Sequence, residues 1–104
     1  MQERVFAYLR TVPRGKVVTY SQIAAALGNK KWARAVGNIL HRNPEPDKYP
    51  CYKVVNAQGK LAANFAFGGL EGQRLRLEAE GIAVVDNTVD LRRYGWQESV
   101  AHEI

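Results

Sequence analysis

The sequence predicts a mainly α-helical domain with a small amount of β-strand, built around a helix-turn-helix and short hairpins. Apolar residues recur at helical spacing in four segments, and two of these segments are separated by a single short turn. The β-branched residues outside them form only short runs. At 104 residues the chain is long enough for one hydrophobic core, so we expect one domain over residues 1–97 and a disordered tail over residues 98–104.

The N-terminal segment, residues 2–10, is predicted to be a helix. Val5, Phe6 and Leu9 lie at helical spacing within it, and a Pro-Arg-Gly sequence ends it. The next residues, 16–20, are β-branched and aromatic, which predicts a short strand.

Two short helices joined by a glycine-containing turn form the predicted helix-turn-helix. We expect Ser21 to cap the first helix, residues 22–27, and Gly28 to end it in the left-handed conformation. Asn29 is expected to precede the second helix, which runs from about residue 31 to residue 42.

The second helix combines a core stripe with a surface of small and polar residues. The stripe is predicted to consist of Ala33, Val36, Gly37 and Leu40. Arg34 and Asn38 lie largely on other faces. The small residues Ala33, Ala35 and Gly37 permit close approach of a partner, but they equally permit tight packing of a second helix.

A proline-rich connector separates the helix-turn-helix from the second half of the chain. Residues 43–48 contain two prolines and therefore cannot continue the helix. Beyond them, residues 52–55 predict a strand, residues 56–59 a turn, and residues 60–63 a returning strand. Together these segments would form a small hairpin or wing.

The C-terminal part is predicted to contain one helix and one hairpin. The helix covers about residues 70–80, has Leu70–Leu77 and Leu75–Ala79 as apolar pairs, and ends at Gly81. The hairpin is expected from residues 84–85 and 88–91, with Tyr94 and Trp96 anchoring the end of the domain.

Charge is distributed unevenly along the chain. Residues 1–60 hold eleven Lys and Arg against three acidic residues, and residues 61–104 hold four against seven, so the net charge of +5 is the sum of +8 and −3. A basic half of this size fits a polyanionic partner, although an ordinary solvated basic surface is the alternative. The sequence has no run of 18 apolar residues and no signal-peptide pattern, so we expect a soluble cytoplasmic monomer without membrane contact.

Cys51 is the only cysteine in the sequence. It cannot form an internal disulfide, and with only His41 and His102 present we expect neither a zinc site nor another metal site. The thiol is therefore either a buried, inert group or a reactive one, and free cysteines are often buried. No cofactor is expected.

The order of several short motifs resembles the DNA-binding and active-site domain of the O6-alkylguanine-DNA alkyltransferases and their alkyltransferase-like relatives. The resemblance runs from about Gly15 to Gly81. It rests on residues 15–20 (GKVVTY), 33–37 (ARAVG), 43–44 (NP), 50–51 (PC), 54–55 (VV), 68–70 (GGL) and 80–81 (EG). It implies a winged-helix-like domain whose second helix enters the minor groove of DNA and whose pocket receives a flipped alkylguanine.

The resemblance also implies chemical roles for matching residues. Cys51 would accept the alkyl group, and Asn43 would hold the turn that presents it. Glu80 would close the hydrogen-bond chain that activates the thiol. Tyr52, which departs from the family pattern, would still relay a hydrogen bond between Cys51, a water and Glu80. The carbonyl groups of Cys51 and Val54 would read the guanine edge.

Other residues are assigned to DNA and lesion contacts in the same way. Tyr20 would contact the phosphate of the target nucleotide and help to rotate it outward. Arg34 would fill the space that the extruded base leaves. Further DNA contacts are expected from Ala33, Ala35, Gly37, Asn38 and Lys53. Phe65 and Phe67 are alternatives for the aromatic wall of the lesion pocket, and core packing is the other interpretation of both.

The sequence departs from the family pattern in three places. Tyr52 and Lys53 stand where the family usually has His and Arg, and a phenol with a pKa of about 10 is a poor base. The loop between Gly59 and Gly68 is about two residues longer than usual. The sequence also has no additional N-terminal domain, a property of the alkyltransferase-like proteins, which usually lack the cysteine.

Three functions remain open on this basis. In the first, the protein recognises O6-alkylguanine in double-stranded DNA and transfers the alkyl group once to Cys51. In the second, it recognises the lesion without chemistry and passes it to other repair proteins. In the third, it is a winged-helix regulator that reads undamaged sequence in the major groove.

Overall fold

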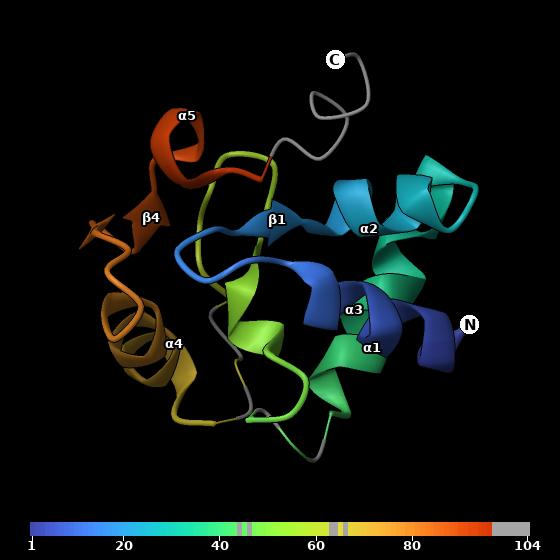
Figure 1. The fold of residues 1–104 in the computed structure, drawn as a ribbon, viewed down its shortest axis with the longest axis horizontal. Helices are drawn as coiled ribbons and strands as arrows, with labels where there is room; N and C mark the ends of the chain where they lie inside the picture. The colour runs from blue at the N-terminus through green and yellow to red at the C-terminus, as the bar shows by residue number, and fades with distance from the viewer. Residues whose placement is uncertain (44, 46, 63–64, 66, 97–104) are drawn as a thin grey trace.

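The computed structural model describes residues 1–43, 45, 47–62, 65 and 67–96. Its helices are α1 (Gln2–Thr11), α2 (Tyr20–Ala26), α3 (Ala33–His41), α4 (Gly69–Glu78) and α5 (Leu91–Tyr94), with the short 3-10 helices η1 (Lys30–Trp32) and η2 (Cys51–Lys53). Its strands are β1 (Val18–Thr19), β2 (Val54–Val55), β3 (Val84–Val85) and β4 (Thr88–Val89). In Figure 1, α1, α2 and α3 lie on one side of β1, and α4, β4 and α5 lie on the other.

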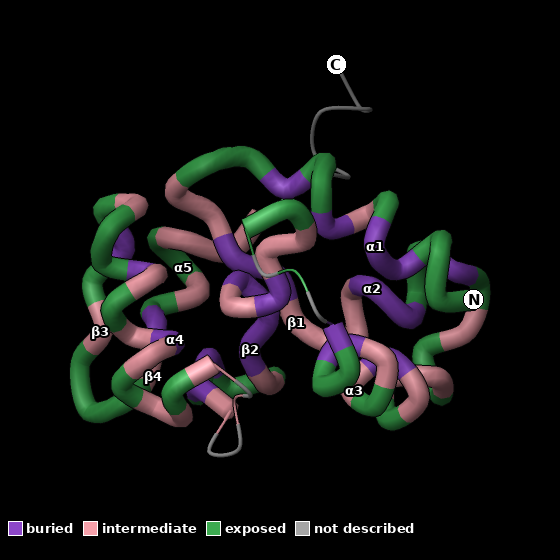
Figure 2. Tube along the Cα trace, turned by 90° about the horizontal axis from the view of Figure 1, so that it is seen from below, coloured by how far each residue is buried: buried purple, intermediate pink, exposed green. Residues whose placement is uncertain are grey.

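The parallel pair β1–β2 lies between two hydrophobic clusters. Val18 pairs with Val54, and both side chains belong to the cluster that α1, α2 and α3 complete. Val17 and Val55 belong to the other cluster, with Leu77 of α4. Successive residues of a strand face opposite sides, so this short ribbon holds the two halves of the domain together. Both residues of β2 are buried, and Figure 2 shows this strand coloured as buried.

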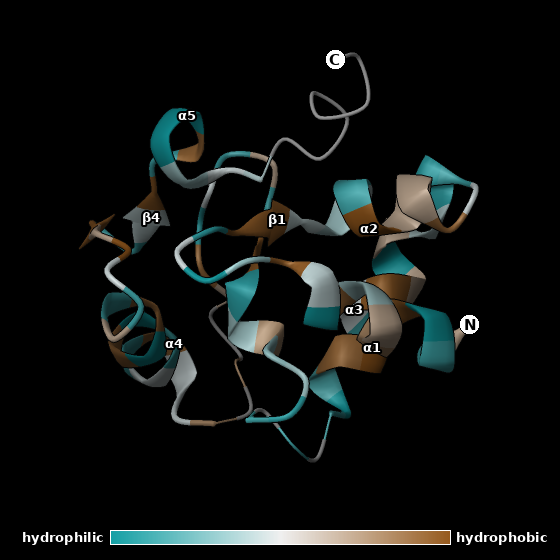
Figure 3. Cartoon of the chain, in the orientation of Figure 1, coloured by the Kyte–Doolittle hydropathy of each residue, from teal (hydrophilic) through white to brown (hydrophobic). Residues whose placement is uncertain are grey.

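The helix α1 confirms the predicted apolar stripe. Val5, Phe6 and Leu9 are all buried, and apolar segments of α1 and α3 adjoin in Figure 3. Among the residues that the structure describes, no helix is long and apolar enough to cross a membrane.

The helix-turn-helix is present, with one correction to its start. Gly28 has a φ of +120°, which favours glycine, and the Asn29 side chain accepts a hydrogen bond from the Lys31 amide. The first helix begins at Tyr20 and not at residue 22, because Thr19, and not Ser21, is its N-cap. Thr19 and Gln22 form a reciprocal capping box, for which the Thr-x-x-Gln spacing is the sequence signal.

The predicted hairpin over residues 52–63 is wrong. β2 pairs with β1, and Lys60 instead forms an antiparallel bridge to Thr88. The Leu61 amide donates to the Asn87 carbonyl at 2.9 Å, so this segment extends the C-terminal hairpin. The strand was expected to include Ala63, which lies outside the described residues.

The C-terminal hairpin and the stop after α4 agree with the prediction, but the second strand ends at Val89 and not at Leu91, because Asp90 caps the unpredicted helix α5. β3 pairs with β4 in antiparallel register through a two-residue turn, in which Asp86 and Asn87 have φ values of 53° and 57°. Gly81 has a φ of +80° just beyond α4. The predicted tail over residues 98–104 lies outside the described residues.

The buried face of α4 differs from the predicted one. Leu77 is fully buried, but Leu75 is 54% exposed, so the Leu75–Ala79 pair does not face the core. Gln73 lies one turn before Leu77 and shares its face, and a residue midway between the two must point away.

Candidate lesion pocket at Cys51

A pocket of about 520 Å³ opens beside Cys51, between the helix-turn-helix and α4. Its volume lies within the range of small-molecule sites. It is lined by Tyr20, Ser21, Ala33, Arg34, Gly37, Asn38, Leu40, His41, Cys51, Asn56, Ala57, Ala62, Phe65 and Gln73.

Cys51 faces both the core and this pocket. Its residue is 7% exposed and belongs to the cluster formed with α1, α2 and α3. Burial raises the pKa of the thiol, and this effect exceeds the opposing influence of an Asn43 hydrogen bond and the Arg76 charge. The sulfur of the free protein is therefore protonated at neutral pH, and a reaction at Cys51 needs an acceptor for its proton.

Asn43 fixes the end of the connector that leads to Cys51. It is 2% exposed, and its Nδ2 donates to the Tyr49 carbonyl at 2.7 Å, while its Oδ1 accepts from the Glu45 amide at 3.0 Å. The Tyr49 carbonyl also accepts from the Cys51 amide at 2.7 Å. One side chain thus sets the turn immediately before the thiol, where the sequence predicted it.

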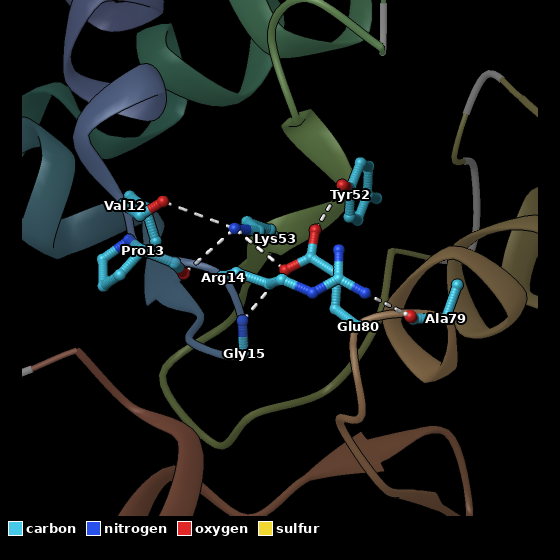
Figure 4. A network of polar contacts seen from close by, with 8 residues as sticks. All are labelled: Val12, Pro13, Arg14, Gly15, Tyr52, Lys53, Ala79 and Glu80. Atoms are coloured by element: carbon cyan, nitrogen blue, oxygen red, sulfur yellow. Dashed lines mark hydrogen bonds and ion pairs between the residues drawn. The ribbon is translucent and has the colours of Figure 1, made fainter.

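Glu80 is the centre of a polar network behind the pocket (Figure 4). Its Oε2 accepts from the Tyr52 hydroxyl at 2.5 Å, and its Oε1 accepts from the Gly15 amide at 3.0 Å and lies 3.0 Å from Lys53 Nζ. Burial disfavours the carboxylate, but these three donors outweigh burial and lower the pKa of Glu80. Glu80 is therefore ionised at neutral pH.

Lys53 does not lie where it could contact DNA, so that prediction is wrong. The residue is 4% exposed, and besides pairing with Glu80 its Nζ donates to the Pro13 carbonyl at 3.0 Å and the Val12 carbonyl at 3.4 Å. A buried ammonium group needs such partners. The partners come from residues about 40 positions earlier, which the local pattern around Lys53 does not indicate.

The α3 side of the pocket carries most of the residues predicted to contact DNA. Ala33, Arg34, Gly37 and Asn38 line the pocket, whereas Ala35 is not among the lining residues. A side chain at Gly37 would meet the Tyr20 ring at 3.8 Å, so the ring lies directly over this small residue. Burial, and secondarily Cys51, raises the pKa of Tyr20, which keeps its hydroxyl protonated.

The aromatic wall is supplied by Phe65. Phe67 does not line the pocket; it packs edge-on against Phe65 with ring centroids 5.7 Å apart. Val54 is 1% exposed in the core and does not line the pocket either, and its carbonyl accepts from Gln73 at 3.2 Å. Of the three residues predicted for the lesion pocket, only Phe65 lies in it.

Gln73 is a site residue that the sequence analysis missed. It is fully buried, its Oε1 accepts from the Ala62 amide at 2.8 Å, and its Nε2 donates to the carbonyls of Tyr52 at 3.0 Å and Val54 at 3.2 Å. It joins the segment around Cys51 to the loop that carries Phe65. The available signal was its position between Leu70 and Leu77 on one helical face, where a polar residue is unexpected.

No group of three or more metal-binding side chains occurs in the part of the chain that the structure describes. The site residues include the Cys51 thiol, the Tyr52–Glu80 pair and the Arg34 guanidinium of α3.

Comparisons with known proteins show which family this chain belongs to. Residues 1–82 match the family described as 6-O-methylguanine DNA methyltransferase, DNA binding domain. The chain is 41% identical to a DNA base-flipping protein of Vibrio parahaemolyticus over 90% of this chain and 93% of that protein. It is 40% identical to the methylated-DNA–protein-cysteine methyltransferase of Rattus norvegicus over 71% of this chain but only 35% of that protein.

Solved structures of similar fold belong to related proteins. The crystal structure of S. pombe Atl1 in complex with damaged DNA containing O6-carboxymethylguanine has a TM-score of 0.82 and 30% identity, covering 92% of this chain and 94% of Atl1. That of Mycobacterium tuberculosis OGT in complex with DNA has a TM-score of 0.70 and 39% identity, covering 77% of this chain and 48% of OGT.

Proposed function

Because the chain belongs to the 6-O-methylguanine DNA methyltransferase family, we propose that it binds double-stranded DNA through the minor groove and takes a flipped O6-alkylguanine into the pocket at Cys51. The observation that supports this proposal is the pocket itself. One of its walls is α3, which carries Arg34, and another contains Cys51, the only cysteine of the chain.

The position of Arg34 supports extrusion of a base. Arg34 is exposed on α3 and lines the same pocket as Cys51, so a guanidinium entering the duplex and a base leaving it would lie close together. Flipping a base costs a few kcal/mol, which contacts in the pocket must offset. Phe65 offers a stacking surface, and the small residues Ala33 and Gly37 allow α3 to approach the backbone.

Lesion recognition is tested by fluorescence anisotropy with two duplexes that differ only in one O6-methylguanine. The proposal predicts tighter binding to the modified duplex, measured at one salt concentration because phosphate contacts make affinity salt-dependent. Equal affinity for both duplexes would show that the pocket at Cys51 does not recognise O6-methylguanine. A preference for one undamaged sequence, indifferent to alkylation, would instead identify a sequence-specific regulator.

Transfer of the alkyl group to Cys51 is the second candidate function. It is favoured by a sulfur that lines the pocket and by a phenol–carboxylate pair whose phenol belongs to the residue after Cys51. In this step an S–C bond forms as the bond from the alkyl carbon to guanine O6 breaks. The electron pair of that bond stays on the guanine, and the thiol proton passes through Tyr52 to Glu80, from which it returns to the departing guanine.

Intact-mass spectrometry separates transfer from recognition alone. After incubation with the O6-methylguanine duplex, a transferring protein gains one methyl group, and Cys51→Ala does not. Tight binding with an unchanged mass would mean that the protein acts as a sensor. In that case it would pass the lesion to another repair protein. We propose that in either case it acts on DNA as a cytoplasmic monomer.

A further inference from the structure

Gln73 of α4 joins two separate walls of the pocket. Its Nε2 donates to the carbonyls of Tyr52 at 3.0 Å and Val54 at 3.2 Å, in the segment that begins at the nucleophilic sulfur. Its Oε1 accepts from the Ala62 amide at 2.8 Å, on the loop that carries Phe65. Gln73 is itself fully buried and lines the pocket between the two walls.

The hydrogen bonds of Gln73 allow only one orientation of its amide. A flipped amide would place its NH2 group against the Ala62 N–H and its oxygen against two carbonyl groups. In the observed orientation the two carbonyls use both N–H groups of the amide. The side chain therefore has no donor left for a base in the pocket, and it acts on a bound base by holding the walls.

The loop that carries Phe65 rests on α4 at further points. The Phe65 amide donates to the Ala62 carbonyl at 3.2 Å, and the Phe65 carbonyl accepts from the Gly69 amide at 2.9 Å. A Cβ atom at Gly72 would lie 2.1 Å from the Phe67 carbonyl oxygen and 3.8 Å from the Phe65 ring. The first turns of α4 thus lie directly against this loop and determine where the aromatic wall stands.

We propose that Gln73 is a positioning residue that determines lesion specificity: it fixes the Phe65 wall relative to the Cys51 segment, so that the pocket has its working shape before DNA binds. This inference rests on the proposed function, the uptake of a flipped alkylguanine.

Preorganisation affects only the complex in which a base occupies the pocket. Ordering a loop or a side chain during binding costs affinity, and a wall that is already fixed avoids this cost. A duplex whose bases stay stacked does not use the pocket, and phosphate contacts dominate its affinity. Gln73 should therefore contribute to the difference in affinity between modified and unmodified DNA, and not to general DNA binding.

The test is the anisotropy titration of Gln73→Met with the O6-methylguanine and guanine duplexes at one salt concentration. Methionine has a similar length but lacks the amide, so both walls lose their link. The preference for the modified duplex is expected to fall by about three- to tenfold, the cost of ordering one side chain on binding. The affinity for the guanine duplex should stay the same.

Gly72→Ala reaches the same wall without removing a hydrogen bond of Gln73. The added methyl group cannot fit against the Phe67 carbonyl, so the loop that carries Phe65 must move. The same selective loss of preference is expected. This variant also provides the test if Gln73→Met does not fold.

Ile82→Ala is the matched control for lost stability. Ile82 is 1% exposed, belongs to the same hydrophobic cluster as Leu77, and is not among the residues that line the pocket. Both Ile82→Ala and Gln73→Met should unfold at lower urea concentration than the unmodified protein. Only Gln73→Met should lose its preference for the modified duplex.

An unchanged preference in folded Gln73→Met or in folded Gly72→Ala would overturn the inference, as would an equal loss of preference in Ile82→Ala. In these cases the unmodified protein still prefers the O6-methylguanine duplex, so the proposed function stands. If the unmodified protein itself shows no preference, the proposed function fails, and this inference fails with it.

Discussion

The Tyr52 hydroxyl donates a hydrogen bond to Glu80 Oε2 at 2.5 Å, so only the lone pairs of the phenol oxygen remain to accept a proton. Burial and the Glu80 carboxylate together raise the pKa of Tyr52, which keeps it a phenol throughout the neutral range. In the proposed transfer, Tyr52 would therefore pass a proton from Cys51 on to Glu80 and would not hold it. A direct consequence is that any transfer to Cys51 should be slow and sensitive to this one position.

Replacing Tyr52 by His is expected to accelerate alkyl transfer by about tenfold or more, because imidazole accepts a proton near neutral pH. Tyr52→Phe keeps the ring but removes the relay, and should slow transfer without abolishing lesion binding. Single-turnover methyl gain on Cys51, followed by intact mass, measures both variants. Unchanged rates in both would show that the proton leaves by another route.

Loss of Lys53 should destabilise the fold and leave DNA contacts unaffected. Lys53→Met strands the buried Glu80 carboxylate and removes a donor from two carbonyls, at an expected cost of about 3–5 kcal/mol. Urea unfolding measures this loss. Arg74→Met removes two solvent-accessible ion pairs and should change stability by no more than about 0.5 kcal/mol. An equal loss of unfolding free energy in Lys53→Met and Arg74→Met would contradict a stabilising role for the Lys53–Glu80 pair.

Acid should weaken the fold partly through Glu80. Burial raises the pKa of Glu80, but the Tyr52, Gly15 and Lys53 donors outweigh it, and the net pKa lies below the ordinary 4.5. A carboxyl with a lowered pKa stabilises the fold fully above its unfolded pKa, and this contribution is lost as pH falls through the folded pKa. The difference in unfolding free energy between the unmodified protein and Glu80→Gln should therefore shrink below about pH 4.5.

The control for this pH dependence is Glu71→Gln, on the exposed surface of α4. Urea titrations of the three proteins across the acid range should give parallel curves for the unmodified protein and Glu71→Gln. If Glu80→Gln also ran parallel to them, Glu80 would not be the group that links pH to stability.

Arg34 should contribute to lesion discrimination and Lys31 to general affinity. Arg34→Ala is expected to bring the affinity ratio between O6-methylguanine and guanine duplexes close to one, because no side chain then fills the space that the flipped base leaves in the duplex. Lys31→Ala, an exposed cation one turn earlier, should weaken both duplexes alike and reduce the salt slope by about one. Anisotropy titrations at several salt concentrations separate the two effects.

Local sequence signals predicted the helix-turn-helix well, and the roles expected at Cys51 stay predictions. Gly28 and Asn29 specify the turn through backbone conformation and capping, which depend only on near neighbours. Asn43, Cys51 and the Glu80 network were located through motif order, although the structure alone shows that Lys53 shares the network.

What the sequence could not predict depends on contacts between distant segments. The parallel pairing of Val18 with Val54 replaced a hairpin that turn residues favoured locally. That pairing brings the segment before β1 to Lys53, whose Nζ donates to the Pro13 carbonyl, whereas Gln73 of α4 is buried against the carbonyls of Tyr52 and Val54. Single-chain patterns contain no record of such partners, so both side chains were expected elsewhere or overlooked.

The central claim is that an alkylated base enters the pocket and reaches the Cys51 sulfur. Its most direct test is protection of Cys51 from iodoacetamide by the O6-methylguanine duplex, followed by intact mass with the unmodified duplex as reference. The account predicts that the modified duplex blocks labelling, either because Cys51 has gained a methyl group or because the bound base covers it. Labelling of Cys51 at the same rate in both complexes would contradict it.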